Sequence, residues 1–259
     1  MASLAQQFFE APGLGREPPA PLMRDAGLHL ALFGAALGAV LSGAFAFGVL
    51  GWWGLATAAL CYAVMAALIL AGLVRHAHPD RFGLANAITL GRAALTALLF
   101  GVAGEWLLGG MALTGGLRWL LAGAASFILV LDGLDGPAAR RSGMASPFGA
   151  RFDMEADALF ILALCLLTTA CSMAGLWLLA SAGLRYAFLA ASQLDRRLAA
   201  PLPPLIRRKA IYVAQASAPI LALIPLCPTG AVLLLCASAF GLVLYSFAAD
   251  CRWLLSHAS

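Results

Sequence analysis

Charged residues are scarce in this chain. Asp, Glu, Lys and Arg make up only 11% of its 259 residues, and Lys209 is the single lysine. Soluble domains carry about 25% charged residues, and nucleic-acid-binding domains need clustered basic side chains. The composition therefore excludes a soluble nucleic-acid binder. Hydrophobic residues make up 63% of the chain, which indicates an integral membrane protein in contact with membrane lipids.

Cysteine motifs and a signal peptide are also missing. None of the six cysteines forms a C-x-x-C pair, and most lie in apolar runs, so we interpret them as small buried hydrophobic residues. Residues 1–26 are mixed in character and contain no apolar core, unlike a cleavable signal peptide. We expect residues 1–26 to form a cytoplasmic N-terminal segment.

Long apolar runs fill the rest of the chain. A bilayer core of about 30 Å needs about 20 apolar residues per helix, and an open sheet cannot span lipid. The sequence therefore predicts an all-α integral membrane protein with about eight transmembrane helices. The expected spans lie near residues 27–50, 52–73, 84–103, 118–135, 150–170, 173–192, 208–226 and 229–248.

The basic residues lie on alternate connections between these spans. If the N-terminus is cytoplasmic, the inner connections hold many arginines, whereas the outer connections hold almost none. This asymmetry predicts that both termini face the cytoplasm. The composition, rich in Ala, Arg and Gly, is typical of a GC-rich bacterium, so the expected location is the bacterial inner membrane.

The first two predicted spans differ from the other six. Residues 27–73 contain no charged side chain, and a polar loop with Arg75 and Asp80 follows them. The residues with chemical potential all lie after this loop. We therefore interpret residues 27–74 as an accessory transmembrane hairpin and residues 80–250 as the functional unit.

Acidic, basic and small residues stand in fixed register between the fourth and fifth predicted spans. They follow the pattern D-x2-D-G-x2-A-R-x8-G-x3-D-x3-D. Its members are Asp132, Asp135, Gly136, Ala139, Arg140, Gly149, Asp153 and Asp157. The spacing places each pair of aspartates on one face of a helix, and Ser146-Pro147 predicts the N-cap and first residue of the second helix. Two antiparallel neighbouring helices would bring the four carboxylates together at the cytoplasmic side.

Four carboxylates in one small volume repel one another unless cations neutralise them. Carboxylate oxygens suit Mg²⁺ or Mn²⁺, and two such ions can clamp the attacking and leaving oxygens of a phosphoryl displacement. We interpret Gly136 and Gly149 as space for a bulky substrate and Arg140 as a phosphate contact. Glu155 lies outside the pattern, and we assign it to solvent or to a supporting contact. An ordinary solvated acidic loop is the alternative, but a pattern of this length favours a site for two divalent cations.

These residues resemble the signature of the CDP-alcohol phosphotransferases, integral membrane enzymes of phospholipid biosynthesis. The segment Leu84-Ala-Asn86-Ala-Ile-Thr89-Leu-Gly-Arg92 is similar to the Pro-Asn-x-(Ile/Leu)-Thr-x-x-Arg start of the family's first core helix, with Ala85 in place of proline. The resemblance covers about residues 80–250. It implies a catalytic domain with a six-helix core, here preceded by an extra N-terminal helical hairpin.

The resemblance implies a role for each matching residue. Asp132 and Asp153 would bridge two metal ions, Asp135 would bind the first ion and Asp157 the second. Asp157 would also deprotonate the acceptor hydroxyl, which would attack the β-phosphorus of CDP-diacylglycerol and release CMP. Contacts with the CDP moiety are implied for Asn86, Thr89, Asp135, Gly136, Ala139, Arg140, Ser146 and Gly149. The resemblance also implies a homodimer.

Basic residues after the motif are candidates for contacts with a small polar acceptor alcohol. They are Arg185, Arg207, Arg208 and Lys209. Arg185 interrupts an apolar span, which favours a functional role. The other three suit a phosphorylated acceptor such as glycerol phosphate or inositol phosphate, and equally suit positive-inside topology with anionic lipid contact.

Two other functions are compatible with parts of this sequence pattern. An ion transporter or channel would place its acidic residues at the bilayer midplane and would not need Arg140, Gly136 or Gly149. A catalytically inactive scaffold of the same fold would have lost at least one residue of the motif, and none is lost. Both alternatives are therefore disfavoured.

Overall fold

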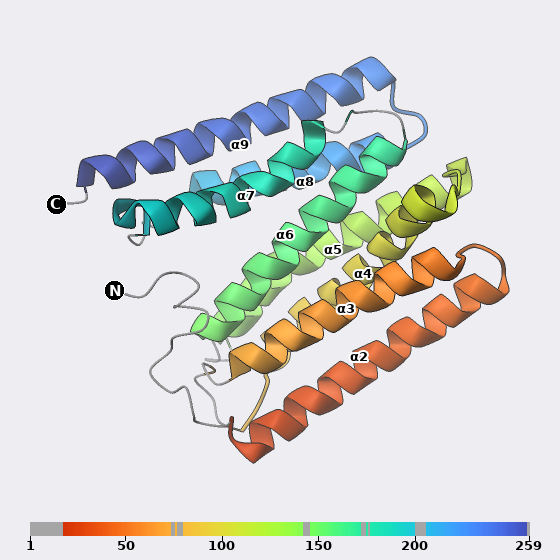
Figure 1. Cartoon of the computed structure of the whole chain (residues 1–259), viewed down its shortest axis with the longest axis horizontal. Coiled ribbons are helices and arrows are strands. Elements are labelled where there is room, and N and C mark those ends of the chain that lie inside the picture. Colours follow the sequence, from red (N-terminus) through yellow and green to blue (C-terminus); the bar gives the residue numbers. More distant parts are fainter. Residues whose placement is uncertain are drawn as a thin grey trace.

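Eight α-helices and one short 3-10 helix make up the part of the chain that the computed structural model describes (Figure 1). The described residues are 18–73, 76, 80–141, 146–171, 175, 177–199 and 206–257, without the side chains of 135–141, 196, 199 and 257. The helices are α2 (Ala20–Ala46), α3 (Trp52–Gly72), α4 (Leu84–Gly109), α5 (Gly115–Arg141), α6 (Pro147–Ala170), α7 (Trp177–Leu194), η2 (Arg196–Ala199), α8 (Ile206–Leu223) and α9 (Thr229–His257). These residues contain no strand, which confirms the predicted all-α fold.

Five of the described helices are long and apolar enough to cross a membrane. They are α2, α3, α4, residues Gly115–Leu134 of α5 and residues Thr229–Ser256 of α9. Among the other three, α6 contains two motif aspartates, α7 contains Arg185 within its apolar stretch, and α8 has three basic residues in its first turn. Each of the eight predicted spans overlaps one helix in this part of the chain, and the fold fits an integral membrane protein.

Helix α2 begins at Ala20 rather than near residue 27. Pro19 is its N-cap and Pro21 lies in its first turn. Proline is tolerated there because the first N–H groups of a helix have no acceptor within the helix. Arg24 and Asp25 consequently belong to α2 and not to a separate N-terminal segment.

Helix α4 lies at the centre of the bundle. It contacts α2, α3, α5 and α6, and 67% of its most apolar stretch is buried, compared with at most 28% in the other four apolar helices. Figure 1 shows α2 and α3 on one side of the molecule and α7, α8 and α9 grouped on the other. Protein therefore surrounds the helix that carries Asn86, Thr89 and Arg92.

Small residues let α3 and α4 pack at backbone distance. A methyl group added at Gly101 would lie 3.1 Å from the carbonyl oxygen of Gly54, and one added at Gly104 would lie 2.1 Å from Thr57 Oγ1. Such contacts between small residues are typical of helix pairs in membranes. In addition, Glu105 Oε2 accepts a 2.7 Å hydrogen bond from the N–H of Gly54 in the first turn of α3, where a negative charge is favourable. The hairpin of α2 and α3 is therefore an integral part of the bundle.

A hydrophobic cluster connects this hairpin to the beginning of α6. Side chains of α2 and α3 pack with Phe82, Phe148 and Phe152, and the rings of Phe148 and Phe152 stack with centroids 6.1 Å apart. Asp25 Oδ2 accepts a 2.7 Å hydrogen bond from the N–H of Phe82. The turn of α6 that carries Asp153 thus rests on side chains from the hairpin.

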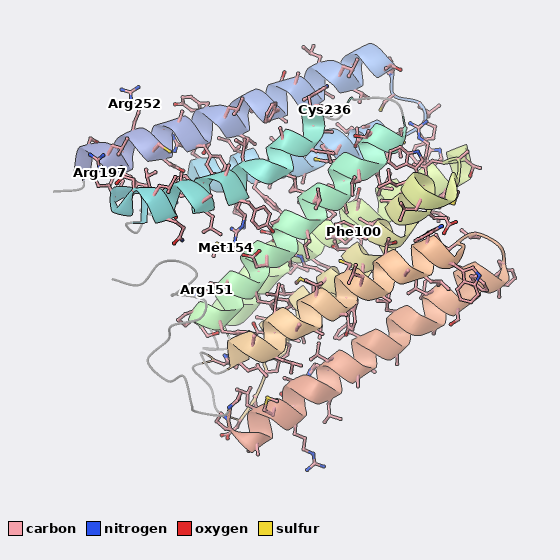
Figure 2. All side chains as sticks on the ribbon, in the orientation of Figure 1. Phe100, Arg151, Met154, Arg197, Cys236 and Arg252 are labelled. Atoms are coloured by element: carbon pink, nitrogen blue, oxygen red, sulfur yellow. The ribbon has the colours of Figure 1, made fainter. Side chains whose placement is uncertain are left out.

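All six cysteines are free thiols, as predicted from their spacing. Cys165 and Cys236 are buried and the other four are partly buried. Figure 2 labels Cys236 on α9.

Met154 of α6 is labelled in the same figure, and its side chain lines a cavity.

Candidate active site

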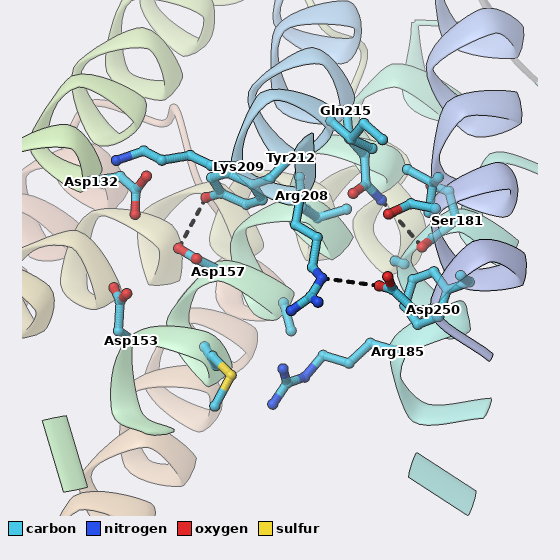
Figure 3. Close-up of a pocket in the computed structure, with 18 residues that line it drawn as sticks. Asp132, Asp153, Asp157, Ser181, Arg185, Arg208, Lys209, Tyr212, Gln215 and Asp250 are labelled. Carbon is cyan, nitrogen blue, oxygen red and sulfur yellow. Dashed lines mark hydrogen bonds and ion pairs between the residues drawn. The ribbon is translucent and has the colours of Figure 1, made fainter. Parts of the chain in front are cut away.

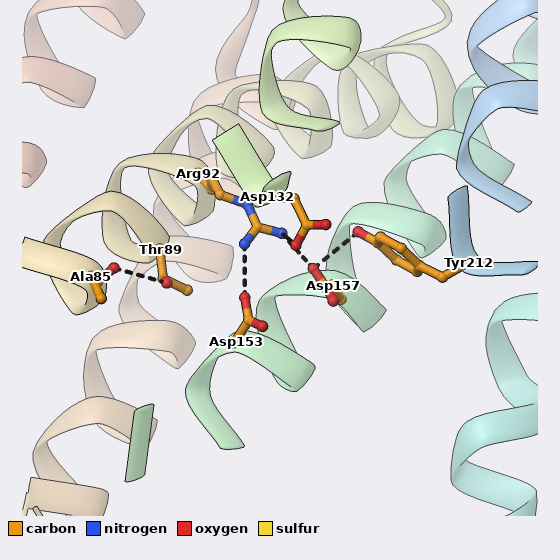
Figure 4. Close-up of polar contacts among 7 residues, drawn as sticks. All are labelled: Ala85, Thr89, Arg92, Asp132, Asp153, Asp157 and Tyr212. Atoms are coloured by element: carbon orange, nitrogen blue, oxygen red, sulfur yellow. Dashed lines mark hydrogen bonds and ion pairs between the residues drawn. The ribbon is translucent and has the colours of Figure 1, made fainter. Parts of the chain in front are cut away.

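Helices α5 and α6 bring three of the motif aspartates together (Figure 4). Asp132, Asp153 and Asp157 each offer a carboxylate oxygen, and these oxygens all lie within 4.8 Å of one another. The i and i+4 spacing of Asp153 and Asp157 places both on the face of α6 that turns toward Asp132. The side chains of Asp135, Gly136, Ala139 and Arg140 lie outside the described residues, although their backbone belongs to α5.

Arg92 of α4 lies in the middle of this carboxylate cluster. Its side chain is only 1% exposed, with Nη2 2.8 Å from Asp132 Oδ1 and Nη1 2.7 Å from Asp153 Oδ1. Nη2 also pairs with Asp157 Oδ1. One guanidinium cannot balance three carboxylates, so the cluster keeps a negative excess that can hold further cations.

The donor set and its accessibility fit a divalent cation. The three ligand candidates are carboxylates, which are the hard oxygen donors that Mg²⁺ and Mn²⁺ prefer. The side chain of Asp153 is 36% exposed and that of Asp157 is 23% exposed. An ion can therefore reach the cluster from the side opposite Arg92.

Tyr212 of α8 holds Asp157 from a second direction. Its hydroxyl donates a 2.9 Å hydrogen bond to Asp157 Oδ1, the same oxygen that pairs with Arg92. Both interactions orient the carboxylate and leave Oδ2 for an ion or a substrate proton. Sequence reasoning missed Tyr212, because an aromatic residue in an apolar helix carries no distinguishing signal.

The N-terminus of α6 is fixed by a hydrogen-bonded chain. Ser146 is the N-cap, as predicted, and its Oγ accepts a 3.0 Å hydrogen bond from the N–H of Gly149. His76 Nε2 lies 3.0 Å from the carbonyl oxygen of Arg81 and must therefore donate to it. In the neutral ring, Nδ1 then accepts from the Ser146 hydroxyl at 3.2 Å. The chain connects the loop after α3 to the helix that carries Asp153 and Asp157.

Asn86 occupies the space beside Gly149. A methyl group added at Gly149 would lie 2.8 Å from Asn86 Oδ1, while Asn86 Nδ2 donates a 2.5 Å hydrogen bond to Phe82 O. A side chain of α4 is thus the neighbour that requires glycine at position 149. The sequence analysis interpreted this glycine as space for a substrate. Thr89 Oγ1 donates to Ala85 O at 3.1 Å (Figure 4). Asn86 and Thr89 are both buried.

A cavity of about 470 Å³ adjoins the aspartates, lined by residues of α5 to α9 (Figure 3). Asp132, Asp153, Asp157 and Tyr212 line one part of it. Its other polar lining residues are Arg185, Arg208, Lys209, Ser181, Gln215, Ser246 and Asp250. Asn86, Thr89, Ser146 and Gly149 do not line it. The cavity therefore joins the carboxylate cluster to three of the four predicted acceptor residues.

The arginines beside the cavity have carboxylate partners. Arg185 Nη2 lies 2.5 Å from Glu155 Oε1. Arg207 Nη2 lies 2.5 Å from Asp250 Oδ1, and Arg208 Nε lies 3.1 Å from Asp250 Oδ2. Glu155 of α6 thus contacts Arg185 of α7. Asp250 of α9 is the partner of Arg207 and Arg208, and the sequence motif did not predict this role.

The comparison with known families agrees with this geometry. The CDP-alcohol phosphatidyltransferase family profile matches residues 82–243, which is more than half of the chain. No curated protein and no solved structure matches the chain. The matched segment begins just before α4 and contains the carboxylate cluster, Arg92, Tyr212 and most of the cavity. The chain therefore belongs to the CDP-alcohol phosphatidyltransferase family.

Proposed function

We propose that this protein transfers a phosphatidyl group from CDP-diacylglycerol to a hydroxyl of a small polar alcohol and releases CMP, as a step of phospholipid synthesis. The observation that carries the proposal is the carboxylate cluster of Asp132, Asp153 and Asp157, with oxygens within 4.8 Å, at the edge of a cavity. The family is one of transferases of CDP-alcohol phosphatidyl groups, and it is known to use divalent metals.

Asp132, Asp153 and Asp157 would hold the divalent cations, with Asp135 as the fourth expected ligand. Mg²⁺ or Mn²⁺ bound there supplies electrostatic stabilisation of negative charge on the phosphate oxygens. Arg92 holds one oxygen of each described aspartate. It therefore holds the carboxylates of Asp132, Asp153 and Asp157 close together.

Asp157 is the proposed general base. Arg92 and Tyr212 both bind its Oδ1, so Oδ2 is the oxygen that can accept the proton of the acceptor hydroxyl. A base acts well only when it is held within hydrogen-bonding reach of that proton. The contacts from α4 and α8 supply this fixed position.

The nucleotide end of the donor is assigned to the beginning of α6 and the end of α5. Ser146 and Gly149 form the first turn of α6, and Gly136, Ala139 and Arg140 follow Asp135 on α5. Asn86 is buried against Gly149 in this turn, and Asn86 and Thr89 stay predicted contacts of the CDP moiety. We propose that Arg140 binds a phosphate of the CDP group.

The distribution of arginines supports a cytoplasm-facing site in a bacterial inner membrane. The homodimer stays a prediction. An ion transporter and an inactive scaffold remain the competing functions, and an activity assay separates all three.

The test uses purified protein in detergent with CDP-diacylglycerol, Mg²⁺ or Mn²⁺, and a panel of alcohols. We expect CMP release that requires both a divalent cation and one acceptor, and that Asp153→Asn abolishes. Metal-dependent binding of CDP-diacylglycerol without CMP release under any condition would instead indicate a scaffold. Cation binding without any binding of the CDP-lipid would indicate a transporter.

A further inference from the structure

The side of the cavity away from the carboxylate cluster is built from paired charges (Figure 3). Arg185 pairs with Glu155, and Asp250 forms ion pairs with both Arg207 and Arg208. The Glu155 and Asp250 side chains are only 15% and 11% exposed. These carboxylates are therefore fixed parts of the site rather than mobile surface groups.

Positive and negative side chains in and directly around the cavity balance one another. The basic side chains are Arg92, Arg185, Arg207, Arg208 and Lys209, and the acidic ones are Asp132, Asp153, Asp157, Glu155 and Asp250. Figure 3 shows Lys209 extending toward Asp132. The described side chains by themselves leave no positive excess to attract an anionic acceptor, and Arg185, Arg207 and Arg208 each keep a carboxylate partner.

A phosphate group seated on Arg185 or Arg208 would lie against Glu155 or Asp250. Placing like charges side by side is strongly unfavourable, and separating a shielded ion pair would leave its carboxylate without a counterion. A hydroxyl or ammonium group instead donates hydrogen bonds to these carboxylates. The guanidinium groups, which only donate, can bind hydroxyl oxygens or a carboxylate of the same molecule.

We propose that the acceptor is a small hydroxyl compound without a phosphate group, of the class of polyols and zwitterionic amino alcohols. This inference rests on the proposed function, because it assigns the acceptor to the same cavity. It departs from the expectation of a phosphorylated acceptor, which rested on the basic residues alone. Their counterions come from α6 and α9, and the sequence does not show that these helices meet α7 and α8.

The first measurement compares CMP release with matched acceptor pairs, in saturating Mn²⁺ and CDP-diacylglycerol. The pairs are inositol and inositol phosphate, glycerol and glycerol phosphate, and serine and phosphoserine. We expect the unphosphorylated member of one pair to exceed its partner in kcat/KM by at least about tenfold. A preference for the phosphorylated member would overturn the inference and leave the proposed function intact. Absence of CMP release with every acceptor would count against the proposed function.

The second measurement does not depend on turnover. Thermal stabilisation by glycerol phosphate is recorded in saturating Mn²⁺ and CMP for the wild type, Asp250→Asn and Glu155→Gln. Each substitution keeps the side-chain size. Glu155→Gln releases Arg185 from its carboxylate, and Asp250→Asn releases Arg207 and Arg208. We expect the wild type to show no shift and at least one variant to gain stabilisation. A wild-type shift as large as that of both variants would overturn the inference, and two variants allow for one that does not fold.

Discussion

The hydroxyl of Tyr212 donates a 2.9 Å hydrogen bond to Oδ1 of Asp157, which connects α8 to the helix that carries two of the three clustered aspartates. Asp157 also pairs through this oxygen with Arg92. The carboxylate is therefore held from two helices, and its orientation depends on both.

Replacing Tyr212 with Phe removes this hydrogen bond and keeps the ring. Hydrogen bonds to charged groups contribute about 1.5–3 kcal/mol, so we expect kcat for CMP release to fall at least about tenfold. Apparent affinity for the CDP-lipid should stay the same. Tyr62→Phe is the matched control, because Tyr62 donates a 2.7 Å hydrogen bond to the carbonyl oxygen of Leu30 within the hairpin and does not line the cavity. Equal kinetics for the two variants would remove Tyr212 from the site.

Asp157→Asn tests the proposed base. The variant keeps the size of the side chain and cannot accept the proton from the acceptor hydroxyl, so turnover should fall about 10²–10⁴-fold. Binding of the CDP-lipid at saturating Mn²⁺ should persist. Single-turnover CMP release and equilibrium binding measure the two effects separately, and turnover at the wild-type rate would exclude Asp157 as the base.

Arg92→Met should make folding depend on divalent cations. Removing the guanidinium leaves Asp132, Asp153 and Asp157 without their resident cation, and loss of one partner of a buried ion pair costs about 3–5 kcal/mol. We expect a lower Tm in metal-free buffer and partial recovery in Mn²⁺. Arg118→Met is the control, since Arg118 donates to the carbonyl oxygens of Ala222 and Leu223 and contacts no motif aspartate in the described structure. An equal response of both variants to Mn²⁺ would contradict the role of Arg92.

Gly149→Ala should destabilise the contact between α4 and α6. The new methyl group would lie 2.8 Å from Asn86 Oδ1, and overpacking of this kind costs about 1–3 kcal/mol. Combining it with Asn86→Ala should cost less than the sum of the two single changes, because the clash is gone. Thermal unfolding of the three variants measures the coupling. Gly123→Ala, with open space at its Cβ position, should leave Tm unchanged or raise it, and additive effects at 149 and 86 would disprove the clash.

The motif aspartates could be placed from sequence because their positions follow the helical repeat. Asp153 and Asp157 share one face at any i, i+4 spacing. The prediction that α5 and α6 pack as neighbours was wrong, because α5 packs mainly against α4 and α8, and Arg92 of α4 connects Asp132 to the two aspartates of α6. The start of α6 at Ser146 and Pro147 follows equally local rules. The shared face of Asp153 and Asp157 and the start of α6 are local features, whereas the position of Asp132 beside them depends on α4.

The partners of the carboxylates could not be predicted in the same way. Tyr212 and Asp250 reach the cavity only because α8 and α9 pack beside it, and no local pattern specifies which helices meet. Arg92 did carry a signal, since it is the only charged residue between 84 and 104. The packing of Asn86 against Gly149 was likewise not predicted, because Asn86 comes from a helix far away in sequence.

Phe82 combines two roles at one position. It is the first residue of the family match, and its N–H is held by Asp25 of α2. The boundary between the hairpin and the catalytic domain is therefore not a point at which the chain can be cut. A truncated protein that starts at residue 82 would lose the acceptor of this N–H and the apolar cover of Phe148 and Phe152, so an engineered six-helix version would have to replace both.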